Sequence, residues 1–352
     1  MGGAMLHRLV GAARSLVAHG LYYSGVLGLW CRVALRHRAV VLTYHRVLPD
    51  EALARTWSHP GIIVTRETFD AHVRTLKRVF RVLSLEEFVA ALESADGFRT
   101  PSCLITFDDG WRDTFTEAFP VLRQHDVPAT VFLPVDYIGA DRMFWQEELS
   151  ALVHRAWERR DDAAVRAACE RSFAAHGFPS VFEASPADVR LLVRTRVNAL
   201  KSGPIAVPRG LIADVRAALG AAVDGLLPVD GFMTWDEVRL MRAGRTTFGG
   251  HGTTHRLLTT LPAAELEDEA ARSRATIARE LAEAPASFSY PNGDWNAGVA
   301  DAVDRAGYRV SFSTERGIVN GGDPRLSLRR FNMHEDATAR PPLLLARLVG
   351  LM

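Results

Sequence analysis

Three short motifs carry side chains that could together bind a divalent metal and move protons around it. Thr106-Phe107-Asp108-Asp109-Gly110 supplies two adjacent carboxylates, and His251-Gly252-Thr253-Thr254-His255 supplies two imidazoles four residues apart. Leu42-Thr43-Tyr44-His45 adds another histidine earlier in the chain. Imidazoles and carboxylates bind zinc and similar ions, and a free carboxylate beside the ion can act as a base. The motifs therefore predict a metal-dependent hydrolase.

The first two motifs each follow a run with strand character. An apolar lead-in ends at Phe107, so the two aspartates should point different ways at the end of a strand. Two like charges this close are costly unless a cation separates their roles. We therefore expect Asp109, His251 and His255 to bind the metal while Asp108 stays free as a base. On a helical turn the two histidines would share one face, and the preceding glycines would let the backbone approach a ligand closely.

Strand-like and helical segments alternate along most of the chain, which predicts parallel strands with helical crossovers. A closed or nearly closed β/α barrel is favoured because the candidate ligands follow strands, and an open doubly wound sheet is the alternative. The expected strands are 39–44, 103–107, 130–134, 246–250, 286–290 and 308–312. The expected helices are 66–78, 85–93, 113–125, 235–242, 263–282 and 297–306.

Between residues 145 and 229 the alternation of strand-like and helical segments stops. Helical patterns occur there at 146–159, 163–176, 186–199 and 208–222. The charges there are mixed and the apolar residues periodic, which favours a solvated helical insertion over a separate binding domain. Trp145 and Trp235 begin helices after loops. Each is either a stacking platform for a sugar ring or a core anchor.

Composition narrows the functional class. The 352 residues include 42 Lys and Arg against 41 Asp and Glu, so no global positive field indicates a nucleic acid partner. The three cysteines, Cys31, Cys103 and Cys169, are odd in number and widely spaced. A disulfide framework is therefore not expected, and a reducing compartment fits the pattern.

Residues 1–38 predict an amphipathic helix. Apolar residues recur at helical spacing from Leu6 to Val17, while residues 15–31 carry no charge and arginines lie on both flanks. A helix lying on a membrane surface and a helix packed on the catalytic domain both fit, and a spanning helix is a third alternative. No small-x-small cleavage site precedes the first strand, so a cleaved signal peptide is not expected.

From about Val40 to His334 the chain resembles the polysaccharide deacetylase family, the NodB-homology carbohydrate esterases. The resemblance implies Asp108 as catalytic base and Asp109, His251 and His255 as metal ligands.

Phe288-Ser289-Tyr290-Pro291-Asn292-Gly293 matches the third family motif. It implies a pocket wall that includes Tyr290, Pro291 and Gly293, with the Tyr290 backbone N–H facing the oxyanion. Ser289 stands where the family often has an arginine that pairs with the base, and Arg329 and Arg330 are candidates to replace it.

The family also uses a Leu-x-x-His near its C-terminal end, whose histidine is the general acid. Leu42-x-x-His45 fits this pattern at the first strand, whereas His334 follows Met333 without it. This favours His45 over His334 and resembles the poly-N-acetylglucosamine deacetylase branch, in which the barrel is circularly permuted. Closure of a barrel brings its first and last strands side by side.

We expect residues 39–340 to form a deacetylase barrel that removes acetyl groups from N-acetylated amino sugars, using a divalent metal, most naturally Zn²⁺. The substrate would be a polysaccharide, as in exopolysaccharide biosynthesis, or a lipid-linked glycan at the cytoplasmic face of a bacterial membrane. The alternatives are an amidohydrolase or O-acetyl esterase acting on another substrate, and a non-catalytic glycan-binding protein on the same fold.

Overall fold

The computed structural model describes residues 2–201, 203–223 and 231–352, which divide into two compact units. The first unit comprises Met1–Ala54, Pro60–Gly139 and Phe232–Met352, and the second comprises Arg55–His59 and Ala140–Gly231. The expected helical insertion, residues 145–229, falls inside the second unit, although its residues 202 and 224–229 lie outside the described residues.

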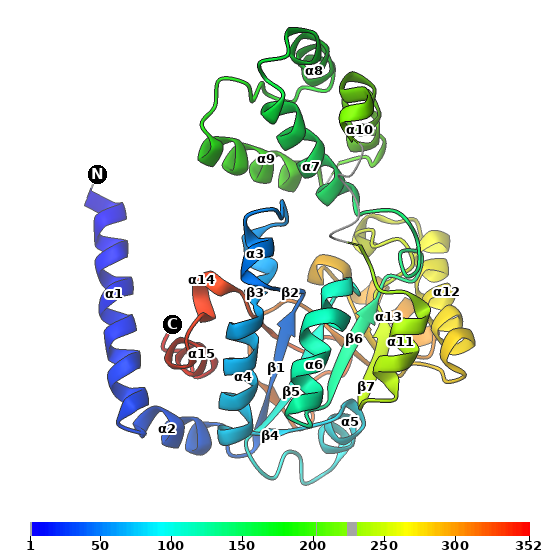
Figure 1. Cartoon of the computed structure of the whole chain (residues 1–352). Coiled ribbons are helices and arrows are strands. Elements are labelled where there is room, and N and C mark those ends of the chain that lie inside the picture. The colour runs from blue at the N-terminus through cyan, green and yellow to red at the C-terminus, as the bar shows by residue number, and fades with distance from the viewer. Residues whose placement is uncertain (1, 202, 224–230) are drawn as a thin grey trace. The chain divides into compact units, whose positions relative to one another are not determined.

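The first unit is built on a mainly parallel sheet of nine strands among the described residues (Figure 1). Along the main path the order is β10-β1-β5-β6-β7-β8-β9, with β11 also paired to β1 and β4 to β5. The strands are β1 (Arg38–Tyr44), β4 (Arg81–Val82), β5 (Ser102–Phe107), β6 (Ala129–Leu133), β7 (Thr246–Gly250), β8 (Ser287–Ser289), β9 (Val310–Phe312), β10 (Val319–Asn320) and β11 (Phe331–Asn332). A separate parallel pair joins β2 (Arg46–Leu48) to β3 (Ile63–Thr65).

Residues 325–332 span the open side of this half-barrel. Leu328 forms a parallel bridge with Phe312 of β9, and β11 then pairs in parallel with Leu42 and Thr43 of β1. The first strand therefore lies beside the last, as expected for a permuted barrel. We call residues 325–332 the closing segment.

Helices cover the sheet between its strands, and their ends have local causes. The Thr65 side chain caps α4 (Arg66–Val79), and reciprocal capping boxes begin α5 (Leu85–Glu93) at Ser84 and α11 (Trp235–Arg242) at Thr234. The remaining helices of this unit that follow β1 are α3 (Asp50–Leu53), α6 (Phe119–Gln124), α12 (Ala263–Leu281), α13 (Ala297–Arg305), α14 (Glu335–Thr338) and α15 (Pro341–Leu348). A buried apolar cluster between sheet and helices includes Phe88, Phe132 and Phe312.

The six expected strands are confirmed, with ends shifted by at most two residues. The short strands β2, β3, β4, β10 and β11 were not expected, because two or three residues carry no detectable alternation. The expected helix over 113–125 is two elements, a π-helical stretch at Thr114–Ala118 followed by α6.

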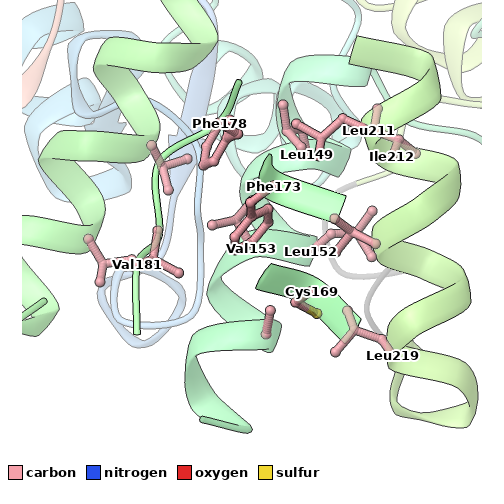
Figure 2. Close-up of a cluster of buried hydrophobic side chains, with 14 of the residues drawn as sticks. Leu149, Leu152, Val153, Cys169, Phe173, Phe178, Val181, Leu211, Ile212 and Leu219 are labelled. Carbon is pink, nitrogen blue, oxygen red and sulfur yellow. The ribbon is translucent and has the colours of Figure 1, made fainter. Parts of the chain in front are cut away.

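The second unit is helical and has its own core. Its helices are α7 (Trp145–Glu158), α8 (Ala163–Ala175), α9 (Pro186–Leu200) and α10 (Ala206–Leu219). Figure 2 shows side chains such as Leu149, Phe173 and Leu211 meeting between them. Because this core is separate, the helical unit buries its apolar residues without drawing on the barrel.

Two helices precede the barrel, α1 (Gly2–Tyr23) and α2 (Val26–Ala34), and both pack against α15. They are joined at Gly25, whose φ of 80° is in the left-handed region that favours glycine. Within the described chain, every helix is too short or too polar to cross a lipid bilayer.

A buried histidine ties β1 to the C-terminal helices. His72 Nδ1 accepts from the Tyr44 hydroxyl at 3.0 Å, and Nε2–H donates to the Thr338 carbonyl at 2.6 Å. Burial lowers the pKa of His72 to about 4, although the bond to Thr338 opposes this shift. The neutral imidazole is therefore the form that the folded state holds.

Acid should destabilise the protein through His72. As pH falls, His72 of the unfolded chain binds a proton before His72 of the folded chain does. The free energy of unfolding should therefore decrease between about pH 6.5 and about pH 4, by at most about 3 kcal/mol. Urea unfolding at pH 7.5 and pH 5 measures this loss, which should shrink in His72→Gln. An unchanged slope in His72→Gln would contradict the assignment.

Candidate active site

The two aspartates at the end of β5 diverge because the chain turns sharply between them. Asp109 and Gly110 have φ values of 75° and 67°, both in the left-handed region. A Cβ on Gly110 would lie 2.8 Å from the end of the Ile138 side chain, and the left-handed backbone would strain any other residue there. The turn sends Asp108 and Asp109 toward different partners, although both carboxylates are buried.

Asp109, His251 and His255 converge with the geometry of metal ligands. Their nearest donor atoms all lie within 4.8 Å of one another, and Asp109 Oδ1 is 3.3 Å from His251 Nε2 and 3.1 Å from His255 Nε2. A tetrahedral ion with bonds of about 2.0–2.1 Å separates its ligand atoms by roughly 3.3 Å. The three side chains therefore fit one divalent ion with a position left open.

Neighbouring groups fix the orientation of two of these ligands. His251 Nδ1–H donates to the Ser289 carbonyl at 2.7 Å, so in the neutral imidazole the Nε2 lone pair faces the site. The Trp111 indole N–H donates to Asp109 Oδ2 at 3.0 Å, so only Oδ1 faces the histidines. Trp111 is fully buried, with the Arg46 guanidinium 4.5 Å from its ring centroid. The role of Trp111 was not foreseen, although it directly follows the Asp-Asp-Gly motif.

The histidines lie on a loop after β7 rather than on the helical turn considered for their spacing. Gly252 and His255 have φ values of 72° and 56°, which no α-helix contains. Glu269 on α12 holds the loop by accepting the Thr253 N–H at 2.6 Å and the Thr254 N–H at 3.1 Å. No sequence pattern pointed to Glu269.

The glycines before His251 serve packing rather than ligand approach. A Cβ on Gly249 would lie 2.6 Å from the Phe132 ring and the Ser287 carbonyl. A Cβ on Gly250 would overlap the Tyr308 hydroxyl. Close packing of β7 against its neighbours therefore requires both glycines.

The site favours a cation beside Asp109. Burial opposes its ionisation, yet hydrogen bonds from His251 and His255 hold the pKa of Asp109 well below its usual range. Burial likewise opposes the charge on His251, but Asp109 raises the His251 pKa overall. A buried carboxylate that remains ionised attracts whichever cation can reach it, and a divalent metal is the stronger competitor for this donor set.

Asp108 forms a buried ion pair with Arg330. The guanidinium donates to Oδ1 at 2.8 Å and to Oδ2 at 2.7 Å, and both side chains are almost fully buried. Ser289 Oγ accepts from the same guanidinium at 2.8 Å and donates to Asp108 Oδ2 at 3.2 Å. Burial raises the pKa of Asp108, but Arg330, together with His251 and His45, more than offsets this and leaves it below the usual value. Asp108 is thus an ionised, oriented base.

The closing segment delivers Arg330 to this position. Arg330 lies between Leu328, which bridges to β9, and Phe331, which pairs with β1. Its Nε–H donates to the Ser313 carbonyl at 2.8 Å, which completes the anchoring. Of the two arginines considered as replacements for the family arginine, Arg330 reaches Asp108, whereas Arg329 is exposed near Glu315.

His45 lies at the site, and the environment of His334 is different. His45 follows β1, and its Nε2 is 4.0 Å from Asp108 Oδ2. Burial lowers the pKa of His45, although Asp109 and Asp108 partly offset this. Burial also lowers the pKa of His334, but the charges that act on it are those of Arg347 and Asp336. The geometry favours His45 as the histidine that exchanges protons with Asp108.

Tyr290 does not offer its backbone N–H to an oxyanion, contrary to expectation. That N–H donates to the Phe312 carbonyl at 3.1 Å, which continues the pairing of β8 with β9. The ring is fully buried, and its hydroxyl donates to the Leu326 carbonyl. Pro291 and Gly293 are also buried, in the turn after β8. Tyr290 therefore packs in the interior next to the site and holds the end of β8 in place.

The two tryptophans considered for sugar stacking lie in different units. Trp145 begins α7 and packs, partly buried, against the helical core, which fits a core anchor. Trp235 begins α11 and is partly exposed near Gly139 of the first unit.

A family profile described as polysaccharide deacetylase matches residues 96–160 and 216–311. The chain therefore has a polysaccharide deacetylase domain. The matched segments contain both aspartates and both loop histidines but neither His45 nor Arg330. Those two residues reach the site from β1 and the closing segment, outside the matched ranges.

Sequence relatives match part of the chain. Over 113 residues it is 31% identical to a poly-beta-1,6-N-acetyl-D-glucosamine N-deacetylase of Staphylococcus epidermidis, covering 30% of this chain and 39% of that protein. It is 26% identical over 125 residues to the Bacillus subtilis protein YxkH, and this alignment covers 35% of this chain and 41% of that protein. The alignments thus span about two fifths of these curated relatives.

Solved structures support the fold along most of the chain. The Streptococcus pyogenes deacetylase PplD superposes with a TM-score of 0.57 at 16% identity, covering 89% of this chain and 99% of that chain. IcaB from Ammonifex degensii superposes with a TM-score of 0.56 at 17% identity, covering 88% of this chain and 97% of that chain. At these identities the likeness establishes the fold.

Replacing Trp111 should weaken metal binding. Trp111→Phe keeps an aromatic ring but removes the N–H that directs Asp109, so metal affinity should fall by about ten- to a hundredfold. Competition with a chromophoric chelator measures this without turnover. The matched control is Trp157→Phe, which removes an indole N–H donated to Ala184 in the helical unit. Equal affinity in Trp111→Phe and wild type would contradict the role of the indole.

Replacing Arg330 should leave a buried charge unpaired. Arg330→Gln should lower the free energy of unfolding by about 3–5 kcal/mol, while the exposed neighbour variant Arg329→Gln should change it by less than about 0.5 kcal/mol. Without the guanidinium, burial raises the pKa of Asp108. The acidic limb of the pH–activity profile should therefore move to higher pH in the folded fraction of Arg330→Gln. An unmoved limb would show that Arg330 does not tune the base.

Proposed function

We propose that this protein is a metal-dependent de-N-acetylase that removes acetyl groups from N-acetylated amino sugars of a polysaccharide or lipid-linked glycan. The observation that carries the proposal is the separation of the two adjacent aspartates. Asp109 joins two imidazoles, while Asp108 is held by Arg330 and Ser289 and faces His45. A binding module has no need for an oriented, ionised base beside a metal site. The name of the Staphylococcus epidermidis relative supports the choice of substrate.

Asp109, His251 and His255 would hold the ion, and two imidazoles with one carboxylate suit Zn²⁺. When bound, the ion polarises the acetamide carbonyl and lowers the pKa of water beside it. Asp108 then takes the proton from the attacking water, since its carboxylate is ionised and its two oxygens are fixed. Arg330 and Ser289 keep the carboxylate in place during the transfer.

His45 would complete the proton path. Burial keeps the imidazole neutral at rest, so it can receive a proton rather than only supply one. Its Nε2 lies 4.0 Å from Asp108 Oδ2, so one water or the reacting group itself would relay the proton between them. As the carbon–nitrogen bond breaks, His45 delivers that proton to the departing amine, and acetate remains. One water is consumed for each acetyl group released.

The oxyanion needs a donor other than Tyr290. The Tyr290 N–H is already bonded, and Pro291 has no N–H. The next backbone donor of the turn is Asn292, whose left-handed φ of 59° changes the direction of the chain at that point. The Asn292 N–H is therefore our candidate, and a preorganised donor of this kind contributes roughly 2.7–4 kcal/mol to catalysis.

Acetate release tests the function. The substrates are β-1,6-linked N-acetylglucosamine oligomers, other N-acetylated oligosaccharides and O-acetylated sugars, each with and without chelator. Chelator-sensitive release from N-acetylated sugars supports the proposal. Release only from O-acetylated sugars would make the protein an esterase, and no release from any substrate by the metal-loaded protein would overturn the enzyme assignment.

Variants of the base and acid test the mechanism. Asp108→Asn should lower kcat by about 10²–10⁴ while metal affinity is retained, because Asp108 lies outside the ligand set. His45→Gln should lower kcat by a similar factor, whereas the matched control His334→Gln should stay near wild type. Substantial turnover in Asp108→Asn, or equal effects of the two histidine variants, would refute these roles.

For its location we propose peripheral attachment to the cytoplasmic face of a bacterial membrane through residues 1–38, where a lipid-linked glycan would be available. The three cysteines are free and buried, which suits a reducing compartment. Fractionation of the intact chain tests attachment, and an active periplasmic reporter fused to the C-terminus would contradict the orientation.

A further inference from the structure

Exposed apolar side chains are concentrated on the two N-terminal helices. Seven of the ten large hydrophobic side chains that are exposed in the described chain lie between residues 16 and 33. On α1 they are Leu16, Val17 and Tyr23, and on α2 they are Val26, Leu29, Trp30 and Val33. Single exposed apolar residues are ordinary, but a concentration of this kind marks an interaction surface.

The second helix is apolar on two faces. Its inner face buries Leu27 and Cys31, and the Cys31 thiol contacts the Leu345 carbonyl of α15. Its outer face exposes Val26, Leu29, Trp30 and Val33, which recur at i, i+3, i+4 and i+7. This spacing forms one continuous stripe along a helix. The inner face anchors α2 to the barrel, so the outer stripe is free to contact something else.

The positive charges in the same segment indicate an anionic partner for the stripe. Arg14, Arg32, Arg36 and Arg38 are exposed in the same N-terminal segment, and the first acidic residue of the chain is Asp50. An apolar stripe with arginines and an aromatic residue beside it matches the boundary of an anionic bilayer. A symmetric contact with a second copy would instead bring the same arginines together, without an acidic residue in this segment to pair with them.

We infer that α2, with the C-terminal half of α1, docks on anionic lipid and inserts the Val26–Val33 stripe at the headgroup boundary. The inference deepens the proposed peripheral attachment by naming the inserted helix, its outer face and the lipid charge. The catalytic groups lie beyond the C-terminal end of β1, whereas α2 precedes its N-terminal end. Docking therefore leaves the site uncovered, and changes on the stripe should not alter turnover of soluble substrates.

Co-sedimentation of the full chain with vesicles tests this surface. Wild type should bind phosphatidylcholine vesicles that contain phosphatidylglycerol and bind pure phosphatidylcholine much more weakly. The double variant Leu29→Gln/Val33→Gln should lower the partition coefficient by at least about tenfold. The matched control Leu191→Gln/Leu240→Gln changes two exposed leucines elsewhere and should bind as wild type. Arg36→Gln/Arg38→Gln should lower binding to the anionic vesicles by about fivefold for each charge removed.

Two further measurements separate the possible outcomes. Quenching of tryptophan fluorescence by brominated lipid should decrease in Trp30→Phe if Trp30 reaches the bilayer. Acetate release from a soluble oligosaccharide should be unchanged in all the double variants, so loss of lipid binding is distinguishable from loss of the enzyme.

Equal vesicle binding by wild type and Leu29→Gln/Val33→Gln would overturn the inference. So would a stable dimer in sedimentation velocity that this variant dissociates, because the stripe would then be an interface between copies of the chain.

Discussion

The buried pair of Asp108 and Arg330 is the constraint on which the site depends. A carboxylate and a guanidinium removed from water lose several kcal/mol of hydration each, and only close bidentate contact with further hydrogen bonds recovers it. Here Ser289 and the Ser313 carbonyl supply those further bonds. The barrel must therefore close with Arg330 inside, and the base is held in one orientation as a result.

The metal ligands show the same reliance on groups behind them. Trp111 leaves one oxygen of Asp109 available, the Ser289 carbonyl orients His251, and Glu269 fixes the loop between the two histidines. Ser289 has two roles, because its carbonyl serves the metal side and its hydroxyl serves the base. The residue that replaces the family arginine thus links the two halves of the site.

The sequence allowed the main strands and the reacting groups to be predicted, because apolar runs such as Leu104–Phe107 and spaced motifs are local signals. It did not distinguish Arg329 from Arg330, since which one faces inward depends on the pairing of β11 with β1. The Tyr290 N–H was misassigned because its acceptor lies on another strand. The spacing of His251 and His255 was informative, but positive φ values at Gly252 and His255 replaced the expected helical turn by a loop.

The position of Arg330 in the chain also orders the maturation of the enzyme during synthesis. The ribosome makes Asp109, His251 and His255 before it makes the closing segment, so the ligand set is complete while Asp108 still lacks its counter-ion. A nascent chain at that stage could capture a metal, but its base would be neither fully dehydrated nor oriented. Under the proposed mechanism, the base would therefore be paired and oriented only once the last strand docks.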